Sequence, residues 1–347
     1  MRKLWMFFVA FYAPATFAQK TYTVDDFSPD YRATVYVTQP KEVFSPGWIR
    51  IEDKKTQKEL FKVKSEALAI DAENGKVTSN IRELPYGKQS VIQYEDFNFD
   101  GIKDFAIEDG HNSCYSLPSF TVYLGSKTGF KRNQAFTNLA HDYCGMFSID
   151  AKQKAIHTMT KSGCCWHQYS LFKIKDGLPH AVEIHEEGLE SYYESKRIEK
   201  WDGHKMAITQ TRTIDKKEVK TLLNFVLKEN AKEVFLFTGK DDNNLNYALI
   251  NKRGNVELAF PQDSKSTDPF FNLSKSPDKL TLLFENGANY VITEAASGQL
   301  TLDVTVDGKT THYTQGDVKK TGTLKDLLLD IPPNAQLKTA SNSELAR

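Results

Sequence analysis

The sequence predicts an all-β protein, and two observations carry this prediction. Short segments rich in β-branched and aromatic residues recur along most of the chain. Asn-Gly or Asp-Gly turns separate many of them, as at 74–75, 286–287 and 307–308. Helical periodicity is weak, and only 323–330 (TLKDLLLD) has the pattern of a short helix. Hydrophobic residues make up 40% of the chain, which is enough apolar surface for packed cores.

The clearest strands lie at 33–39 (ATVYVTQ), 48–53 (WIRIED) and 119–125 (SFTVYLG). Each is short and rich in the residue types that favour a pleated, half-buried surface. The segment 154–177 is typical of a β-hairpin, with its turn near 161–163 (KSG). Short turns join most of these predicted strands, so the strands are expected to pair antiparallel.

Two β domains are predicted from the length of the chain and from a change in its composition. The stretch ESYYESKRIEKWDGHK, which begins at Glu190, is polar and charged and separates two sets of strands. We expect an N-terminal β-rich domain, propeller-like or built as a twisted sheet or sandwich, and a C-terminal antiparallel β domain with a short helix. The expected boundaries are 1–18 for a signal peptide, 19–195 for the first domain, 196–220 for the boundary region, 221–334 for the second domain and 335–347 for a polar tail.

The first 18 residues predict a secretory signal peptide. Arg2 and Lys3 precede an apolar run over 4–13, Pro14 breaks the run, and small residues lead to Ala18. The run is too short for a permanent membrane span, and the alternative is a buried N-terminal helix. Cleavage after Ala18 predicts an exported protein, which we assign to the periplasm.

The overall charge excludes some partners. Without the predicted leader, 43 basic residues face 45 acidic ones, so the net charge is −2. A surface with this balance has no general electrostatic attraction for nucleic acid or anionic membranes. No second apolar run is long enough to span a membrane.

The four cysteines, Cys114, Cys144, Cys164 and Cys165, predict two disulfides, because an even count in an exported protein favours pairing. Three pairings are possible. A bridge between the adjacent Cys164 and Cys165 is uncommon, so the favoured pairings join Cys114 and Cys144 each to one of these two. The alternative is a zinc site at Cys164, Cys165 and His167, although adjacent cysteines have poor spacing for zinc.

The acidic segment YEDFNFDGIKDFAIEDG predicts a calcium site. Oxygen-bearing side chains occupy the first, third, fifth and ninth positions of a loop, a glycine the sixth, and a backbone carbonyl is offered at the seventh. Hard cations such as Ca²⁺ take six to eight oxygen ligands. The predicted ligands are Asp96, Asn98, Asp100, the carbonyl of Ile102, and Asp104.

The predicted calcium ion is structural. Position 12 of the loop is Ile107 rather than the glutamate of a helix–loop–helix site, so the segment predicts a strand–loop–strand site. The ligands nearly saturate the ion, and a cation would relieve the repulsion between three carboxylates. The alternative is an acidic turn that binds no ion tightly.

No catalytic motif is complete in this chain, so we expect it not to be an enzyme. The segment HEEGLE at 185–190 lacks the second histidine of a zinc-protease helix. The chain has neither a G-x-S-x-G serine motif nor a phosphate-binding loop. Acidic pairs are present, but a sequence alone does not show two carboxyl groups facing across a cleft.

Three segments together resemble a known family: VIQYEDFNFDGIKDFAIEDG from Val91, NSCYSLPSFTVYLGSKTGF from Asn112 and SGCCWHQYSLFKI from Ser162. They resemble the periplasmic calcium-binding immunity proteins that protect Gram-negative bacteria against lysozyme-like effectors of type IV secretion systems. These are similar in build to periplasmic inhibitors of invertebrate-type lysozyme. The resemblance covers roughly 22–184 and leaves the second domain uncovered.

The resemblance implies an all-β domain, calcium at Asp96, Asn98, Asp100 and Asp104, and a loop that plugs the active cleft of a glycan hydrolase. A muramidase cleft carries two catalytic carboxyl groups, so an inhibitor should present hydrogen-bond donors and an aromatic ring on a rigid loop. The residues expected to contact the partner are His111, Asn112, Tyr115, Lys161 and His167. The alternative is that Tyr115, Trp166 and His167 are ordinary core or strand residues.

These observations support three hypotheses of function. The first is an exported, calcium-stabilised inhibitor of a lysozyme-like peptidoglycan hydrolase. The second is an envelope adhesion or assembly module that binds glycan or protein without inhibition, which the second β domain favours. The third is a cell-wall hydrolase whose carboxylates the sequence does not pair.

Overall fold

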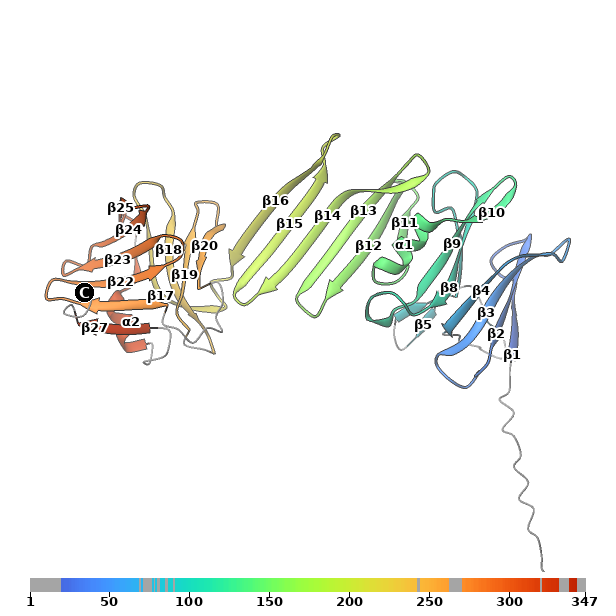
Figure 1. Cartoon of the computed structure of the whole chain (residues 1–347), viewed down its shortest axis with the longest axis horizontal. Helices are drawn as coiled ribbons and strands as arrows, with labels where there is room; N and C mark the ends of the chain where they lie inside the picture. Colours follow the sequence, from blue (N-terminus) through green and yellow to red (C-terminus); the bar gives the residue numbers. More distant parts are fainter. Residues whose placement is uncertain are drawn as a thin grey trace, which may run out of the picture. The chain divides into compact units, whose positions relative to one another are not determined.

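A computed structural model describes most of the chain. The described residues are 20–68, 70, 77, 79, 82–84, 87–89, 91–241, 244–261, 270–318, 320–330 and 337–341. The predicted signal peptide, 1–18, and most of the predicted tail lie outside them. The described part is mostly β-strand in several sheets, with two short α-helices, so the all-β prediction is confirmed (Figure 1).

The chain divides into two compact units. The first comprises 1–185 and 199–207, and the second comprises 186–198 and 208–347. The predicted boundary region, 196–220, contains strand residues of β15 (Tyr193–Trp201), β16 (Met206–Ile214) and β17 (Val219–Val226) in this structure. Among the described residues, no helix is long and apolar enough to cross a membrane.

The first unit begins with a four-stranded antiparallel sheet in the order β1-β2-β3-β4. Its strands are β1 (Lys20–Val24), β2 (Tyr31–Val37), β3 (Ser45–Asp53) and β4 (Glu59–Leu68). Side chains alternate between the two faces, because successive residues of a strand point in opposite directions. One face is buried, and the following residues on it are each at most 6% exposed: Ala33, Val35, Val37, Ile49, Ile51 and Val63. That face packs against the next sheet through β4 and β8 (Asp104–Gly110).

The second sheet of this unit has the order β10-β9-β8-β7. Its strands are β7 (Ile92–Glu95), β8 (Asp104–Gly110), β9 (Ser119–Ser126) and β10 (Gly129–Arg132). β8 is central and buried over almost its whole length, so the loops at its two ends start from a fixed support. A two-stranded pair, β5 (Arg82–Leu84) and β6 (Gly87–Gln89), precedes this sheet.

Helix α1 (Gln134–Asp142) follows β10 and was not predicted. The Asn133 side chain caps it by accepting a hydrogen bond from the Phe136 backbone N–H at 3.2 Å. The helix buries Phe136, Leu139 and Ala140, which have the i, i+3, i+4 spacing of one helical face. This short periodicity is visible in the sequence, but strand patterns surround it on both sides.

A six-stranded sheet follows, in the order β11 to β16. Its strands are β11 (Ser148–Asp150), β12 (Ala155–Ser162), β13 (Trp166–Lys175), β14 (Leu178–Glu190), β15 (Tyr193–Trp201) and β16 (Met206–Ile214). β12 and β13 form the predicted hairpin, with the turn at 163–165, two residues later than expected. The division between the two units falls within β14, β15 and β16.

The second unit contains two further sheets. One has the order β20-β19-β18-β17-β26, with β17 (Val219–Val226), β18 (Glu233–Gly239), β19 (Asn246–Ile250), β20 (Val256–Phe260) and β26 (Thr321–Gly322). The other has the order β25-β24-β23-β22-β21-β27, with β21 (Phe271–Lys275), β22 (Lys279–Glu285), β23 (Asn289–Ala295), β24 (Leu300–Val306), β25 (Lys309–Thr314) and β27 (Leu337–Ser341). Neighbouring strands of these two sheets run antiparallel, except that β21 and β27 are parallel. A shared apolar core lies between them.

Helix α2 (Leu324–Asp330) lies within one residue of the predicted helix. Its first turn has reciprocal hydrogen bonds: the Thr323 N–H donates to the Asp326 carboxylate at 2.7 Å, and the Asp326 N–H donates to the Thr323 hydroxyl at 3.3 Å. The start of this helix is therefore set by a capping pair that its own sequence supplies.

Candidate functional site

The acidic segment forms a strand, a loop and a strand, as its sequence predicts. The loop lies between β7 and β8, and Asp104 is the first residue of β8. Phe97 is 1% exposed and packs in the core beneath the loop, with Phe99 packed against the same core. The alternation of phenylalanines and oxygen donors therefore separates an apolar side from a polar side.

Asp104 is the buried anchor of this loop. One carboxylate oxygen accepts the Phe97 backbone N–H at 2.7 Å, and the other accepts the Gly125 backbone N–H at 2.7 Å. Burial raises the pKa of Asp104 to about 6, although these two hydrogen bonds act to lower it. The nearby carboxylates of Asp100 and Asp96 also raise the pKa. The residue thus joins the start of the loop to strand β9.

Asp96, Asn98 and Asp100 hold the turn itself. The Asp96 carboxylate accepts the backbone N–H groups of Asp100 and Gly101, at 3.1 and 2.8 Å. Asn98 contacts Asp100 twice, and Asp100 accepts the Ile102 N–H at 2.8 Å. Gly101 has a φ of 89°, a region that favours glycine.

The donor chemistry of this turn suits a hard cation, because every candidate ligand is an oxygen. Ile102 stands at the seventh position of the loop, where its carbonyl was expected to serve. No cluster of three or more His, Cys, Asp or Glu side chains arranged for a metal occurs among the described residues. Both oxygens of Asp104 already accept backbone hydrogen bonds, so a cation would have to share them. Asp96, Asn98 and Asp100 are the residues that would hold it from the exposed side.

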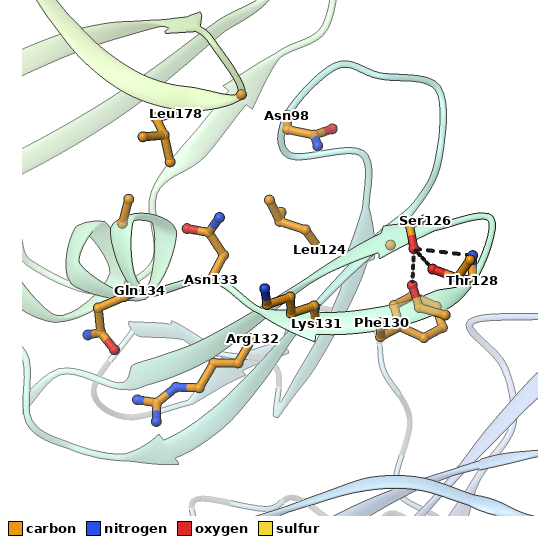
Figure 2. A pocket seen from close by; sticks show the side chains of 14 residues that line it. Asn98, Leu124, Ser126, Thr128, Phe130, Lys131, Arg132, Asn133, Gln134 and Leu178 are labelled. Carbon is orange, nitrogen blue, oxygen red and sulfur yellow. Dashed lines mark hydrogen bonds between the residues drawn. The ribbon is translucent and has the colours of Figure 1, made fainter.

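An open pocket of about 650 Å³ lies beside the acidic loop. Figure 2 shows Asn98 of the loop across the opening from Leu124 and Lys131 of the β9–β10 hairpin. None of the described residues that line it is Asp or Glu.

The disulfides differ from the pairing that the sequence favoured, and that prediction is wrong. Cys114 pairs with Cys144, and Cys164 pairs with its neighbour Cys165. Cys144 lies next to the Cys114 loop, since the Gly145 N–H donates to the Ser113 hydroxyl at 2.9 Å. Cys164 and Cys165 occupy the exposed turn of the β12–β13 hairpin, where they meet each other.

Tyr115 is the most prominent side chain of the loop that follows β8. It lies in a short 3₁₀ turn (Cys114–Ser116) with a left-handed backbone, φ 53°, and is 59% exposed. The Cys114–Cys144 disulfide pins the preceding residue. The Tyr115 hydroxyl accepts the Gly163 N–H from the hairpin turn. This aromatic side chain is therefore both exposed and fixed.

The β12–β13 hairpin continues the surface around Tyr115. The Lys161 ammonium lies 5.1 Å from the centre of the Tyr115 ring, within the range of a cation–π contact. Lys161 is paired with His167 across the hairpin, so both side chains leave the same face. His167 stacks on Tyr169, which is 49% exposed. We call Tyr115, Lys161, His167 and Tyr169 the tyrosine surface.

Two other expected contact residues lie at the base of this loop. Asn112 is exposed, and its backbone N–H donates to the Ser119 hydroxyl at 3.2 Å. The His111 side chain is only 8% exposed, so most of its surface is covered by the protein itself. A β-bulge between Glu108 and Gly110 shifts the side-chain alternation, so the ring turns inward.

His111 supports the loop from beneath. Its Nδ1 donates to the Ser116 carbonyl at 2.8 Å, and its Nε2 lies 3.5 Å from the fully buried Glu108 carboxylate. Burial lowers the pKa of His111, but Glu108 and Ser116 together raise it above the ordinary value. Phe44 packs edge-on against the ring at 4.5 Å.

The contacts of Asp109 also support the Tyr115 loop, and they were not predicted from the sequence. The Asp109 carboxylate accepts hydrogen bonds from Ser119 at 2.6 Å and Thr121 at 2.7 Å, and lies 2.9 Å from His141 Nε2. It joins β8, β9 and the last turn of α1 beneath the Tyr115 loop. The sequence pattern does place Ser119 and Thr121 on one face of β9. It does not show their partner, because Asp109 lies 10 and 12 residues away along the chain.

Comparisons with known proteins add little to what the geometry of the site shows. No family model and no curated protein matches the chain. The chain is similar to a solved structure described as "Structure of a Xanthomonas Type IV Secretion System related protein", with 19% identity and a TM-score of 0.43. The similarity covers 56% of this chain and 94% of the other. Similarity at this level is too low to carry the function of that protein to this chain.

Proposed function

We propose that this protein is an exported, calcium-stabilised binding protein that inhibits a lysozyme-like peptidoglycan hydrolase in the periplasm. In this proposal the Tyr115 loop enters the active cleft of the hydrolase, and the rest of the tyrosine surface contacts its rim. The protein itself performs no catalysis.

The observation that carries the proposal is the fixation of an exposed tyrosine. Tyr115 is 59% exposed, yet a disulfide, a hydrogen bond from Gly163 and the Lys161 ammonium hold it in place. An exposed ring that is already ordered loses little conformational entropy on binding. Fixed aromatic side chains of this kind often provide most of the binding energy of an interface.

The chemistry of the tyrosine surface complements an acidic cleft. A glycoside hydrolase of the lysozyme type uses two carboxyl groups that flank the scissile bond. Lys161 supplies three N–H donors, and the Tyr115 hydroxyl and the Asn112 amide supply further donors nearby. These groups can pair with carboxylates while the ring occupies the space of a sugar.

Calcium has a supporting role in this proposal. Held by Asp96, Asn98, Asp100, the Ile102 carbonyl and Asp104, the ion would neutralise repelling carboxylates and order the loop before β8. Because β8 connects that loop to the Tyr115 loop, ordering one end of the strand supports the position of the other.

A peptidoglycan-clearing assay tests the proposal. The purified protein is added to a panel of lysozymes and lysozyme-like effectors, as wild type, Tyr115→Ala and Trp201→Ala. Trp201 is the matched control, because it is 44% exposed and lies outside the tyrosine surface. We expect stoichiometric inhibition of at least one hydrolase, weakened about 30-fold or more by Tyr115→Ala, which corresponds to about 2 kcal/mol.

Three outcomes would count against the proposal. Wild-type protein that inhibits no member of the panel would remove the inhibitor function. Equal losses in Tyr115→Ala and Trp201→Ala would remove the assigned surface. Clearing of peptidoglycan by the purified protein alone would identify a hydrolase instead of an inhibitor.

A further inference from the structure

The outer face of the first sheet carries an unusual set of side chains. The inner face of β1 to β4 is apolar and buried, as described above. On the outer face, cross-strand pairing places Tyr36 opposite Trp48, Trp48 opposite Lys64, and Arg50 opposite Lys62. Residues that are directly opposite in an antiparallel sheet share a face. We call these five side chains the basic aromatic face.

The two aromatic rings form the centre of this face. The rings of Tyr36 and Trp48 stack at 5.2 Å with an angle of 13° between their planes. The Lys62 ammonium lies 3.9 Å from the centre of the Trp48 ring, and the Arg50 guanidinium lies 5.5 Å from it. Both distances allow cation–π attraction. The rings therefore sit among cations on an open β-sheet surface.

In the part of the chain that the structure describes, the lysines of this face have no carboxylate partner. Among the described residues, neither Lys62 nor Lys64 forms an ion pair, and both are exposed. Arg50 differs, because it shares the Glu52 carboxylate with Arg32, at 3.1 and 3.2 Å. Glu52 thus neutralises only one of these two arginines.

The acidic side chains nearby do not cancel this charge. Glu52 is 10% exposed at its side chain and has both oxygens engaged by arginines. Glu66 follows Lys64 by two residues on β4 and so lies on the same face, and Glu59 is paired with Glu52 across the strands. The four cations Arg32, Arg50, Lys62 and Lys64 therefore exceed the three carboxylates of this face by one charge. The local surplus of positive charge contrasts with a chain that is close to neutral overall, so it attracts anions to one place.

We propose that the basic aromatic face binds an acidic glycan strand. Carboxylates of such a glycan would pair with Lys62 and Lys64, drawing Lys62 away from the Trp48 ring. The apolar faces of the sugar rings would pack on Trp48 and Tyr36, and the Thr34 and Tyr36 hydroxyls would bond sugar hydroxyls. Neighbouring strands lie ~4.8 Å apart, so the face accommodates an extended ligand across several strands.

A glycan fits this face better than a purely acidic peptide. Side-chain carboxylates alone would engage the lysines but would leave the stacked rings without a function. A sugar ring offers an apolar face and many hydroxyl groups in one rigid unit, which matches rings and cations side by side. This inference does not depend on the proposed inhibitor function, because the two surfaces share no residue.

Tryptophan fluorescence and calorimetry test the inference with defined probes. Oligogalacturonate is the acidic glycan, maltohexaose the neutral glycan, and oligoglutamate the acidic peptide. We expect oligogalacturonate to bind and to change the Trp48 fluorescence, because Lys62 leaves the ring. Maltohexaose should not bind. Binding should weaken as salt is added, because the contacts are charged and exposed.

Matched variants separate the face from general charge. Lys62→Gln with Lys64→Gln should weaken oligogalacturonate binding about 10-fold or more. Lys127→Gln with Lys152→Gln removes the same charge from exposed lysines elsewhere in the first unit and should leave binding unchanged. Trp48→Leu should weaken binding and abolish the fluorescence change. Thermal melts establish that each variant is folded.

The inference fails if oligogalacturonate does not bind, or if both pairs of lysine variants weaken it equally. It also fails if oligoglutamate binds as tightly and Trp48→Leu has no effect, since the face would then be only a patch of charge. Tyr115→Ala should leave glycan binding intact. This last variant separates a failure here from a failure of the inhibitor proposal.

Discussion

The loop before strand β8 and the loop after it are held by different kinds of interaction. The first, over 96–103, is closed by carboxylates that accept backbone N–H groups, with Asp104 at its base. The second, over 111–118, is closed by the Cys114–Cys144 disulfide and by contacts beneath Tyr115. One strand thus carries an electrostatic closure at its start and a covalent closure at its end.

This difference indicates a division of roles. A loop closure formed by clustered carboxylates depends on solution conditions, because the repulsion between the carboxylates must be relieved by protons, hydrogen bonds or a cation. A disulfide holds its loop independently of pH and cations. The loop that presents the exposed tyrosine is closed by the disulfide, and a pre-organised binding surface requires a closure of this kind.

The largest predicted effect comes from the covalent closure. Cys114→Ser with Cys144→Ser should lower the free energy of unfolding by about 3–4 kcal/mol, because the bridge closes a loop of 30 residues. Cys164→Ser with Cys165→Ser is the control, since a bridge between neighbours closes almost no chain. Chemical denaturation measures both. Equal losses would show that loop closure is not what the first disulfide contributes.

Calcium should have the next largest effect. At a free concentration 100 times its dissociation constant, the ion should add about 2.7 kcal/mol to the free energy of unfolding. Thermal melts in calcium and in chelator measure the difference, with Asp100→Ala as the variant that should lose it. A melting temperature unaffected by chelator would leave the first loop as an acidic turn stabilised only by its own hydrogen bonds.

Asp104 should matter even without a cation. In chelator, Asp104→Asn replaces one of the two oxygens that accept the Phe97 and Gly125 N–H groups, and should cost about 1–3 kcal/mol. Asp100→Asn is the control, because Asp100 is exposed and its contacts lie within the turn. A smaller loss for Asp104→Asn than for Asp100→Asn would contradict the role of Asp104 as the buried anchor.

The smallest effect should come from His111, through pH. Its pKa is raised in the folded protein, so protonated His111 contributes stability below the ordinary pKa of about 6.5. That contribution is lost as pH rises through the folded pKa. Relative to His111→Gln, the wild-type melting temperature should therefore be highest at acidic pH and fall towards pH 8. A difference that grows with pH would contradict the Glu108 contact.

The sequence specified the strands well because their pattern is local. Ala33, Val35 and Val37 alternate with polar residues, and this period alone identifies β2 and its buried face. Helix α1 was missed because a nine-residue helix offers only Phe136, Leu139 and Ala140 as its apolar face. Its cap, Asn133, is equally typical of a turn.

The candidate site was less predictable because its contacts are long-range. The disulfide pairing depends on which loops meet, and no local pattern shows that Cys144 approaches Cys114 rather than the hairpin turn. His111 was expected at the surface, but the bulge after Glu108 turns it inward. Asp109 gains its importance from Ser119, Thr121 and His141, which lie on other elements.

The most direct test asks which of the two loops meets the partner. Hydrogen–deuterium exchange is measured with and without each hydrolase of the panel, at saturating concentration and in calcium. The account predicts slower exchange at 111–117 and at the hairpin turn, 161–168, with 96–103 unchanged. Protection confined to 96–103, or no protection with any hydrolase, would contradict the assignment of the Tyr115 loop as the inhibitory surface.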